Sequence, residues 1–242
     1  YLSDDGTGTV FFKFVADRAG DLSSGTLYAA KATQDRGVTD PAKAGFDLRW
    51  LALGQASDAE IAEWIADYDA VTVDGDAEPD YITDQQINDW AEAKRGKDLD
   101  GSGRVAEAPF GDDRVAFLES RKAAAALGAT AEFRKMEGVN INDAAAKDGS
   151  VPFMYMAMSN VNRTMADDRG DIQLAANECG VVYRMPLEEG YAVSRMEPAV
   201  AGGPYDASAA ANPCAVTNIA EPDNLVVMAD GRVIIGEDTD QH

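Results

Sequence analysis

The chain ends in Glu221-Pro-Asp-Asn-Leu-Val-Val-Met-Ala-Asp-Gly-Arg-Val-Ile-Ile-Gly-Glu-Asp-Thr-Asp-Gln-His242, and this stretch carries its clearest structural signal. Two β-rich runs, Leu225–Met228 and Arg232–Gly236, flank the pair Asp230-Gly231. An Asp-Gly pair between hydrophobic runs is a strong short-range signal for a tight β-hairpin turn. The sequence therefore predicts a C-terminal β-hairpin.

Oxygen-bearing side chains stand at both open ends of this hairpin. Asp223 and Asn224 enter it, and Glu237, Asp238 and Asp240 leave it. A tight turn brings the two ends together, and carboxylate and amide oxygens are the ligands that hard cations such as calcium prefer. We therefore predict a metal site there, although Asp223-Asn224 is also compatible with an Asx-turn bonded to its own backbone.

Other short strands are predicted along the chain, separated by turn residues. They are Thr9–Val15, Thr26–Lys31, Val151–Met158, Gly180–Met185 and Ala192–Pro198. This spacing is typical of a β-propeller or a sandwich, so the expected fold class is mainly β. Four methionines near the third strand are expected to fill a core rather than to bind a soft metal: Met154, Met156, Met158 and Met165.

A helical and acidic segment is predicted to interrupt the strands. Asp58–Tyr68 has helical apolar spacing, with Ser57 as N-cap and Glu60 at the capping-box position. Thr83–Trp90 and the Ala-rich Asp113–Leu127 read as two further helices. We therefore divide the chain into propeller strands over 1–54, a helical insertion over 55–130, and propeller strands over 131–242.

Two acid-rich loops in this insertion are candidate calcium sites. Asp98, Asp100 and Ser102 occupy positions 1, 3 and 5 of an EF-hand loop, and a glycine occupies position 6. Position 12 is Pro109, where a bidentate Glu is expected. The second loop, Asp74-Gly-Asp-Ala-Glu-Pro-Asp80, lacks the central glycine. The alternative for both is a hydrophilic turn.

The charge balance narrows the classes of partner. The 242 residues carry 43 acidic and 21 basic side chains, a net charge of −22. Nucleic-acid binding is disfavoured because phosphate backbones require Lys and Arg stripes. No apolar run approaches the roughly 20 residues of a membrane span. Such acidity suits a medium in which calcium or salt offsets the self-repulsion.

The two cysteines, Cys179 and Cys214, lie in polar, loop-like sequence. In an exported protein they are expected to form a disulfide across a loop of about 35 residues, although two unrelated thiols are the alternative. The single histidine, His242, excludes a His-based metal site or a Ser-His-Asp triad within this chain.

Several motifs occur in one family's order. They are Asp4-Asp5, Lys13-Phe-Val15, Ala19-Gly-Asp-Leu-Ser23, Phe133-Arg-Lys-Met-Glu-Gly-Val139, Gly170-Asp-Ile-Gln-Leu174, Asn177-Glu-Cys-Gly-Val-Val-Tyr-Arg184 and Glu221–His242. Together they resemble the secreted PhoX-type alkaline phosphatases, which are calcium- and iron-dependent β-propellers. The resemblance covers most of the chain apart from residues 55–112.

The resemblance implies roles for particular residues. Glu137 matches an active-site acid of the family, and Asp223, Asn224, Glu237 and Asp238 match residues near its metal cluster. Asp4 and Asp5 are further candidate ligands at a strand end, although Asp4-Asp5-Gly6 also suits a simple turn. The family commonly has Arg two residues before the Glu, where this chain has Lys135, a point charge rather than a bidentate fork. Arg134 is adjacent, but on a regular strand it would face the other way.

We interpret the sequence as the C-terminal part of a secreted calcium-rich propeller that hydrolyses phosphate monoesters. Lys135 or Arg134 would support the developing charge, and the resemblance implies calcium and Fe³⁺ as cofactors. The family's metal-ligating Cys segment is not present, so the remainder of a longer chain is expected to be required. A non-catalytic calcium-binding propeller with an attachment role is the alternative. Ester or lactone hydrolysis is less favoured because no His is available as base.

Overall fold

The computed structural model describes residues 1–71 and 81–241. The Asp74–Asp80 loop, one of the two predicted calcium loops, lies outside the described residues, as does His242. Strand accounts for 34% of the chain and helix for 21%, so the fold is mainly β as predicted. By its internal contacts the chain divides into two units, residues 1–11, 31–49 and 130–242 in the first and 12–30 and 50–129 in the second.

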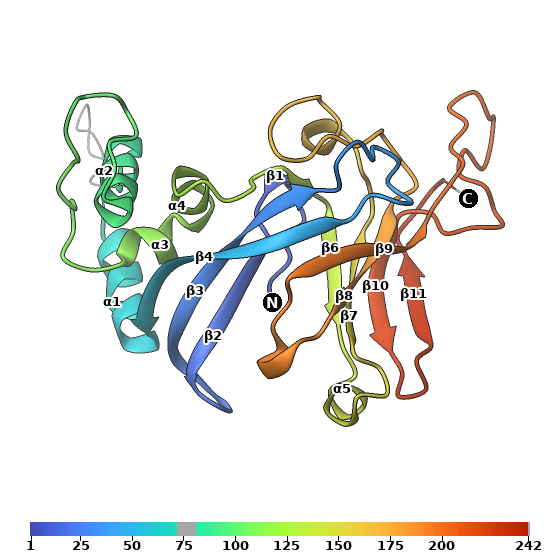
Figure 1. Cartoon of the computed structure of the whole chain (residues 1–242), viewed down its shortest axis with the longest axis horizontal. Coiled ribbons are helices and arrows are strands. Elements are labelled where there is room, and N and C mark those ends of the chain that lie inside the picture. The colour runs from blue at the N-terminus through green and yellow to red at the C-terminus, as the bar shows by residue number, and fades with distance from the viewer. Residues whose placement is uncertain (72–80, 242) are drawn as a thin grey trace. The chain divides into compact units, whose positions relative to one another are not determined.

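Seven strands form one antiparallel sheet in the order β2-β3-β4-β9-β8-β7-β6 (Figure 1). Their bounds are β2 Phe12–Arg18, β3 Asp21–Gln34, β4 Phe46–Ser57, β6 Met136–Asn140, β7 Phe153–Met158, β8 Val181–Pro186 and β9 Arg195–Ala201. The long strands β3 and β4 contribute residues to both units. Two short pairs complete the strands: β1 Thr7–Thr9 with β5 Phe133–Arg134, and β10 Pro222–Val227 with β11 Val233–Glu237.

The predicted C-terminal hairpin is confirmed. β10 and β11 pair antiparallel, with Leu225 opposite Ile235 and Pro222 opposite Glu237. Gly231 in the connecting turn has a φ of +87°, a left-handed conformation that glycine adopts without strain. Because Pro222 faces Glu237, the two open ends of the hairpin lie side by side.

The first unit has a core of methionine and aromatic side chains. Met154, Met156, Met158 and Met165 are all at most 2% exposed, which confirms their prediction as core residues. Phe46 packs against the rings of Phe133 and Tyr183, with centroids 6.4 and 6.0 Å away. A short helix, α5 Asp143–Asp148, and two single 3-10 turns, Arg163–Met165 and Glu189–Tyr191, connect strands of this unit.

The second unit contains four helices in its described part: α1 Asp58–Asp69, α2 Asp84–Arg95, α3 Arg114–Leu118 and α4 Ser120–Ala126. The predicted capping box of Ser57 and Glu60 is present at the start of α1, and Thr83 with Gln86 forms a second one on α2. The prediction of one helix over Asp113–Leu127 was wrong in one respect. Glu119 has a non-helical φ of −124° and ψ of 42°, which separates α3 from α4.

The predicted disulfide between Cys179 and Cys214 is present, with their Cα atoms 5.8 Å apart. Both cysteines are fully buried and cluster with Ala220, although their immediate sequence neighbours are polar.

Candidate functional site

Glu137 lies where strand β5 gives way to β6. Lys135 separates these strands and has a φ of +49°, so the chain makes a left-handed step between them. The regular alternation assumed for Arg134 and Lys135 therefore does not apply, and the expectation that they face opposite ways rested on a continuous strand that is not there. The N–H of Lys135 donates to the carbonyl of Gly6, 2.8 Å away, which holds the N-terminal segment against this step.

The Lys135 ammonium joins two carboxylates. It donates to Asp5 and lies 3.1 Å from Oε1 of Glu137. Ser159 follows strand β7, whose last residue pairs with Met136, and its hydroxyl donates to the same Glu137 oxygen at 3.1 Å. The side chain of Glu137 is only 13% exposed. Burial raises the pKa of this carboxyl, and the hydrogen bond and charge of Lys135 partly offset the rise.

Arg134 brings a second cation to the same strand junction. One of its terminal nitrogens donates to the hydroxyl of Thr7, its partner in the β1–β5 pair. Its Nε–H is buried and has no hydrogen-bond acceptor among the described residues. Burial lowers the pKa of Arg134, and the nearby charge of Arg163 lowers it further. Leaving a buried donor without an acceptor costs free energy. A ligand oxygen that accepted from this N–H would remove that cost.

A chain of amides and carboxylates continues from Ser159 along the same strand ends. Asn162 donates to Oε2 of Glu178 at 2.6 Å, and Asn160 donates to Oε1 of Glu221 at 3.2 Å. The side-chain oxygen Oδ1 of Asn162 is buried and has no donor among the described residues. Hard oxygen ligands and an unpartnered buried oxygen fit a divalent cation.

Sequence analysis missed these additional polar residues. Ser159, Asn160, Asn162 and Arg163 lie directly after the predicted strand Val151–Met158, in a segment to which no role was assigned. Glu178 and Glu221 did lie inside quoted motifs, one before Cys179 and one opening the C-terminal hairpin. Their position next to predicted strand starts was the available signal.

The hairpin end and the Glu137 strand lie against each other. A Cβ on Gly138 would stand 2.7 Å from the carbonyl oxygen of Asp223 and 3.2 Å from the Cα of Asn224. The structure therefore brings the backbone of Asp223 and Asn224 directly beside the residue after Glu137. On the other hairpin strand, Oε1 of Glu237 accepts from the N–H of Ala220 at 2.9 Å.

The remaining predicted ligands have more local roles. The carbonyl of Asp4 accepts from Gly6 at 3.0 Å, as in the turn that was the alternative prediction. The N–H of Asp238 donates to the carbonyl of Glu221 at 3.3 Å. Asp5 and Glu137 are brought together through Lys135.

Three carboxylates of the second unit form the one group within residues 1–71 and 81–241 whose ligand atoms all lie within 4.8 Å of one another. They are Glu92, Asp98 and Asp100. The predicted loop supplies Asp98 and Asp100, and the Ser102 hydroxyl of the same loop donates to the carbonyl of Arg104 at 3.1 Å. Glu92, which sequence analysis missed, comes from α2. It accepts from the N–H groups of Leu99, Asp100 and Ala106, and it is 2% exposed.

The chain is a mainly β protein in which a buried carboxylate lies beside a lysine ammonium, a combination suited to binding an anionic ester. Compared with known families, the chain matches the family "Alkaline phosphatase PhoX" over residues 1–242, and it belongs to that family.

Family membership indicates a metal-dependent phosphatase. Neither the curated proteins nor the solved structures include a match to the chain. Across the part of the chain that the structure describes, no helix has the length and apolar character needed to cross a membrane.

Proposed function

We propose that this chain hydrolyses phosphate monoesters at the site formed by Glu137, Lys135 and Arg134, as part of a secreted metal-dependent β-propeller. The observation that carries the proposal is that the buried Glu137 carboxylate lies beside the Lys135 ammonium. Arg134, the residue before Lys135, adds a buried Nε–H that has no acceptor among the described residues. A phosphoryl group requires cationic donors for its oxygens and a group that handles a proton.

Each residue has a distinct task in this proposal. Arg134 and Lys135 bind phosphoryl oxygens and stabilise the charge that develops on them. Glu137, whose pKa burial raises, is the group that accepts or releases a proton. Asp5 and Ser159 are positioning residues, since Asp5 fixes the Lys135 ammonium and Ser159 fixes Oε1 of Glu137.

The residues present also fit the metal ions that the family implies. Glu137, Glu178 and Glu221 provide carboxylates, and the buried oxygen of Asn162 provides a neutral ligand without a partner among the described residues. Asp4, Asp5, Asp223, Asn224, Glu237 and Asp238 remain proposed ligands from the strand ends. Bound calcium or iron would supply neutralisation of the phosphoryl oxygens and a lowered pKa for a water.

Turnover of p-nitrophenyl phosphate by the full-length protein tests the proposal, with p-nitrophenyl acetate as the matched carboxylic ester. We expect phosphate release with little acetate hydrolysis, and R134A is expected to lower kcat/KM by roughly 10²-fold because a donor to the phosphoryl group is lost. Acetate hydrolysis without phosphate release, or full activity in R134A, would contradict the assignment. Arg169→Ala, an exposed arginine, serves as control.

We also propose that the Glu92–Asp98–Asp100 cluster binds calcium and stiffens the loop after α2. Glu92, on the preceding helix α2, takes the place of the glutamate that is missing from position 12 of the loop, and it joins Asp98 and Asp100. Calcium is expected to raise the Tm of the wild type but not of D98N/D100N. An equal rise in both would assign the calcium effect to another site.

The alternative function is that of a non-catalytic calcium-binding propeller with an attachment role. The Glu92 cluster favours it, because that cluster involves none of the proposed phosphate-binding residues. Under this alternative, chelation lowers the Tm while no phosphate ester is hydrolysed. Secretion is supported by the Cys179–Cys214 disulfide, since such bonds persist in oxidising compartments.

A further inference from the structure

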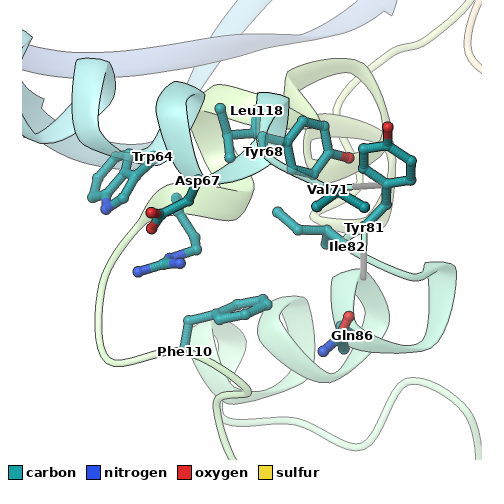
Figure 2. A pocket seen from close by; sticks show the side chains of 10 residues that line it. Trp64, Asp67, Tyr68, Val71, Tyr81, Ile82, Gln86, Phe110 and Leu118 are labelled. Atoms are coloured by element: carbon teal, nitrogen blue, oxygen red, sulfur yellow. The ribbon is translucent and has the colours of Figure 1, made fainter. Parts of the chain in front are cut away.

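A slot of about 270 Å³ lies among the helices of the second unit (Figure 2). None of its lining residues belongs to the Glu137 site. Helix α1 and the segment after it supply four of them, the entry to α2 three, and α3 with the loop before it three. They are Trp64, Asp67, Tyr68, Val71, Tyr81, Ile82, Gln86, Phe110, Arg114 and Leu118.

Helical spacing explains why these residues meet. Trp64, Asp67 and Tyr68 are three and four residues apart on α1 and therefore share one face of it. Arg114 and Leu118 have the same four-residue relation on α3. The rings are fixed: Tyr68 donates to Oε1 of Glu119 at 2.6 Å and stacks edge-on with Tyr81 at 4.8 Å.

The slot has two apolar walls. Figure 2 shows Phe110 on one side and Leu118, Tyr68 and Ile82 on the other. Two facing apolar walls suit a ring that is apolar on both faces. The volume lies just below the roughly 300–1,000 Å³ of pockets for drug-sized ligands, so it suits a single ring.

Polar groups stand at the two ends of the slot. In Figure 2, Asp67 lies at the Trp64 end and Gln86 at the opposite end. The Gln86 carbonyl oxygen caps α2 by accepting from the N–H of Thr83 at 2.9 Å. Its amide Nε2 has no acceptor in the described part of the chain, and so it is available to a ligand.

The charged side chains around the slot disfavour both cationic and anionic ligands. The Arg114 guanidinium donates to both oxygens of Asp112, at 2.9 Å each, and it lies over the rings of Phe110 and Trp64. The positive charge beside those two rings disfavours a second cation there. Asp67, Asp112 and Glu119 outnumber the one arginine, which disfavours an anion.

We propose that the slot binds one pyranose ring of a neutral carbohydrate. The C–H faces of such a ring are apolar and pack against Phe110 and Tyr68, while its hydroxyl groups lie on the rim. Each hydroxyl both donates and accepts, so the Asp67 carboxylate and the Gln86 amide satisfy opposite edges of the same ring. The second unit therefore carries a sugar-binding function separate from ester hydrolysis.

Saturation-transfer NMR on the full-length protein tests this inference with methyl glucosides, galactosides and mannosides and with N-acetylglucosamine. Choline and benzoate are the comparators. We expect at least one neutral sugar to bind with a roughly millimolar Kd, as a ligand of about a dozen non-hydrogen atoms allows. D67N and F110A are expected to weaken it by at least about tenfold.

D69N removes the same charge from an exposed position of α1 that does not line the slot, so it should leave the Kd unchanged. Asp67 is exposed, so D67N should not disturb the fold, and it keeps the test valid if F110A fails to fold. Binding of choline or benzoate in place of every sugar would overturn the proposal. So would the absence of sugar binding, or sugar binding that D67N and F110A leave intact.

Discussion

The Glu137 carboxylate is held in conditions that oppose its ionisation. Because burial raises its pKa, the folded protein binds this proton more tightly than the unfolded chain does. The stability that this proton contributes to the folded protein is present below the ordinary carboxyl pKa and falls as pH rises towards the higher pKa of the folded state. Above that higher pKa, the contribution is lost and the buried charge destabilises the fold. Such destabilisation at one residue is typical of sites kept for chemistry.

Replacing Glu137 by Gln is therefore expected to separate stability from activity. E137Q should have a higher Tm than the wild type at about pH 8, with a smaller difference at about pH 4, while phosphatase turnover falls by roughly 10²–10⁴-fold. Calorimetry and p-nitrophenyl phosphate assays measure the two effects. E189Q, at an exposed glutamate, controls for the substitution. A lower Tm for E137Q at pH 8 would contradict the burial argument.

Lys135 has an electrostatic effect that can be measured independently of binding. Its charge lowers the pKa of Glu137, so K135M should move the acid limb of the pH–rate profile to higher pH. Loss of a donor to the phosphoryl group should also reduce kcat/KM by about 10²–10³-fold. K147M, which breaks an exposed pair on α5, should do neither. An unchanged acid limb in K135M would show that Lys135 does not control Glu137.

At the residue scale, a motif or a turn in the sequence marked some of the candidate site residues. The resemblance pointed to Glu137 and Lys135, and the hairpin ends pointed to Asp223 and Glu237. Glu92 could not be assigned to the acidic loop from sequence, because its contact with that loop depends on how α2 packs. The left-handed step at Lys135 was also hidden, since no glycine marks it.

At the scale of elements, the approach of β10 to β6 depends on one glycine. G138A would place a Cβ 2.7 Å from the Asp223 carbonyl oxygen and 3.1 Å from the Leu225 nitrogen, both backbone atoms that cannot rotate away. We expect a loss of about 1–3 kcal/mol and a Tm lower by roughly 2–10 °C. A parallel drop in kcat would indicate that the strand ends have moved apart.

Gly111 provides the matched control for this variant. A Cβ there meets no atom within 4 Å, so G111A should be nearly neutral in thermal unfolding. If G138A and G111A unfold at the same temperature, the close packing of β10 on β6 is not required for stability.

Elements with a clear periodic or turn signal were predicted well, and others required the tertiary structure. The hairpin and the capped helix α1 follow from local sequence. Strand β4 was not predicted, although Phe46 to Arg49 alternates between buried and exposed positions. The break at Glu119 has no clear local signal, because no glycine or proline marks it and residues compatible with a helix continue on both sides.

At the scale of the whole molecule, the disulfide ties the loop before β8 to the segment leading into the C-terminal hairpin. The backbone N–H of Glu221 donates to the carbonyl of Cys179 at 3.0 Å, so the bond lies next to proposed site residues. For a separation of 35 residues, C179A/C214A is expected to lose about 3–4 kcal/mol and roughly 6–15 °C in Tm. An unchanged Tm would show that the link adds no stability.

The net charge of −22 gives bound cations a second role besides chemistry. Like charges destabilise a compact state through self-repulsion, and calcium at the strand ends or in the Glu92 cluster would reduce it. Removing metal should therefore affect stability and activity together if the proposed phosphatase account holds.

Metal content measured together with turnover tests that account most directly. Elemental analysis of the purified full-length protein is paired with p-nitrophenyl phosphate hydrolysis before and after EGTA. We predict calcium with iron, and hydrolysis that the chelator abolishes. Calcium alone, with no hydrolysis and a lower Tm on chelation, would contradict the phosphatase account and leave a calcium-stiffened structural protein.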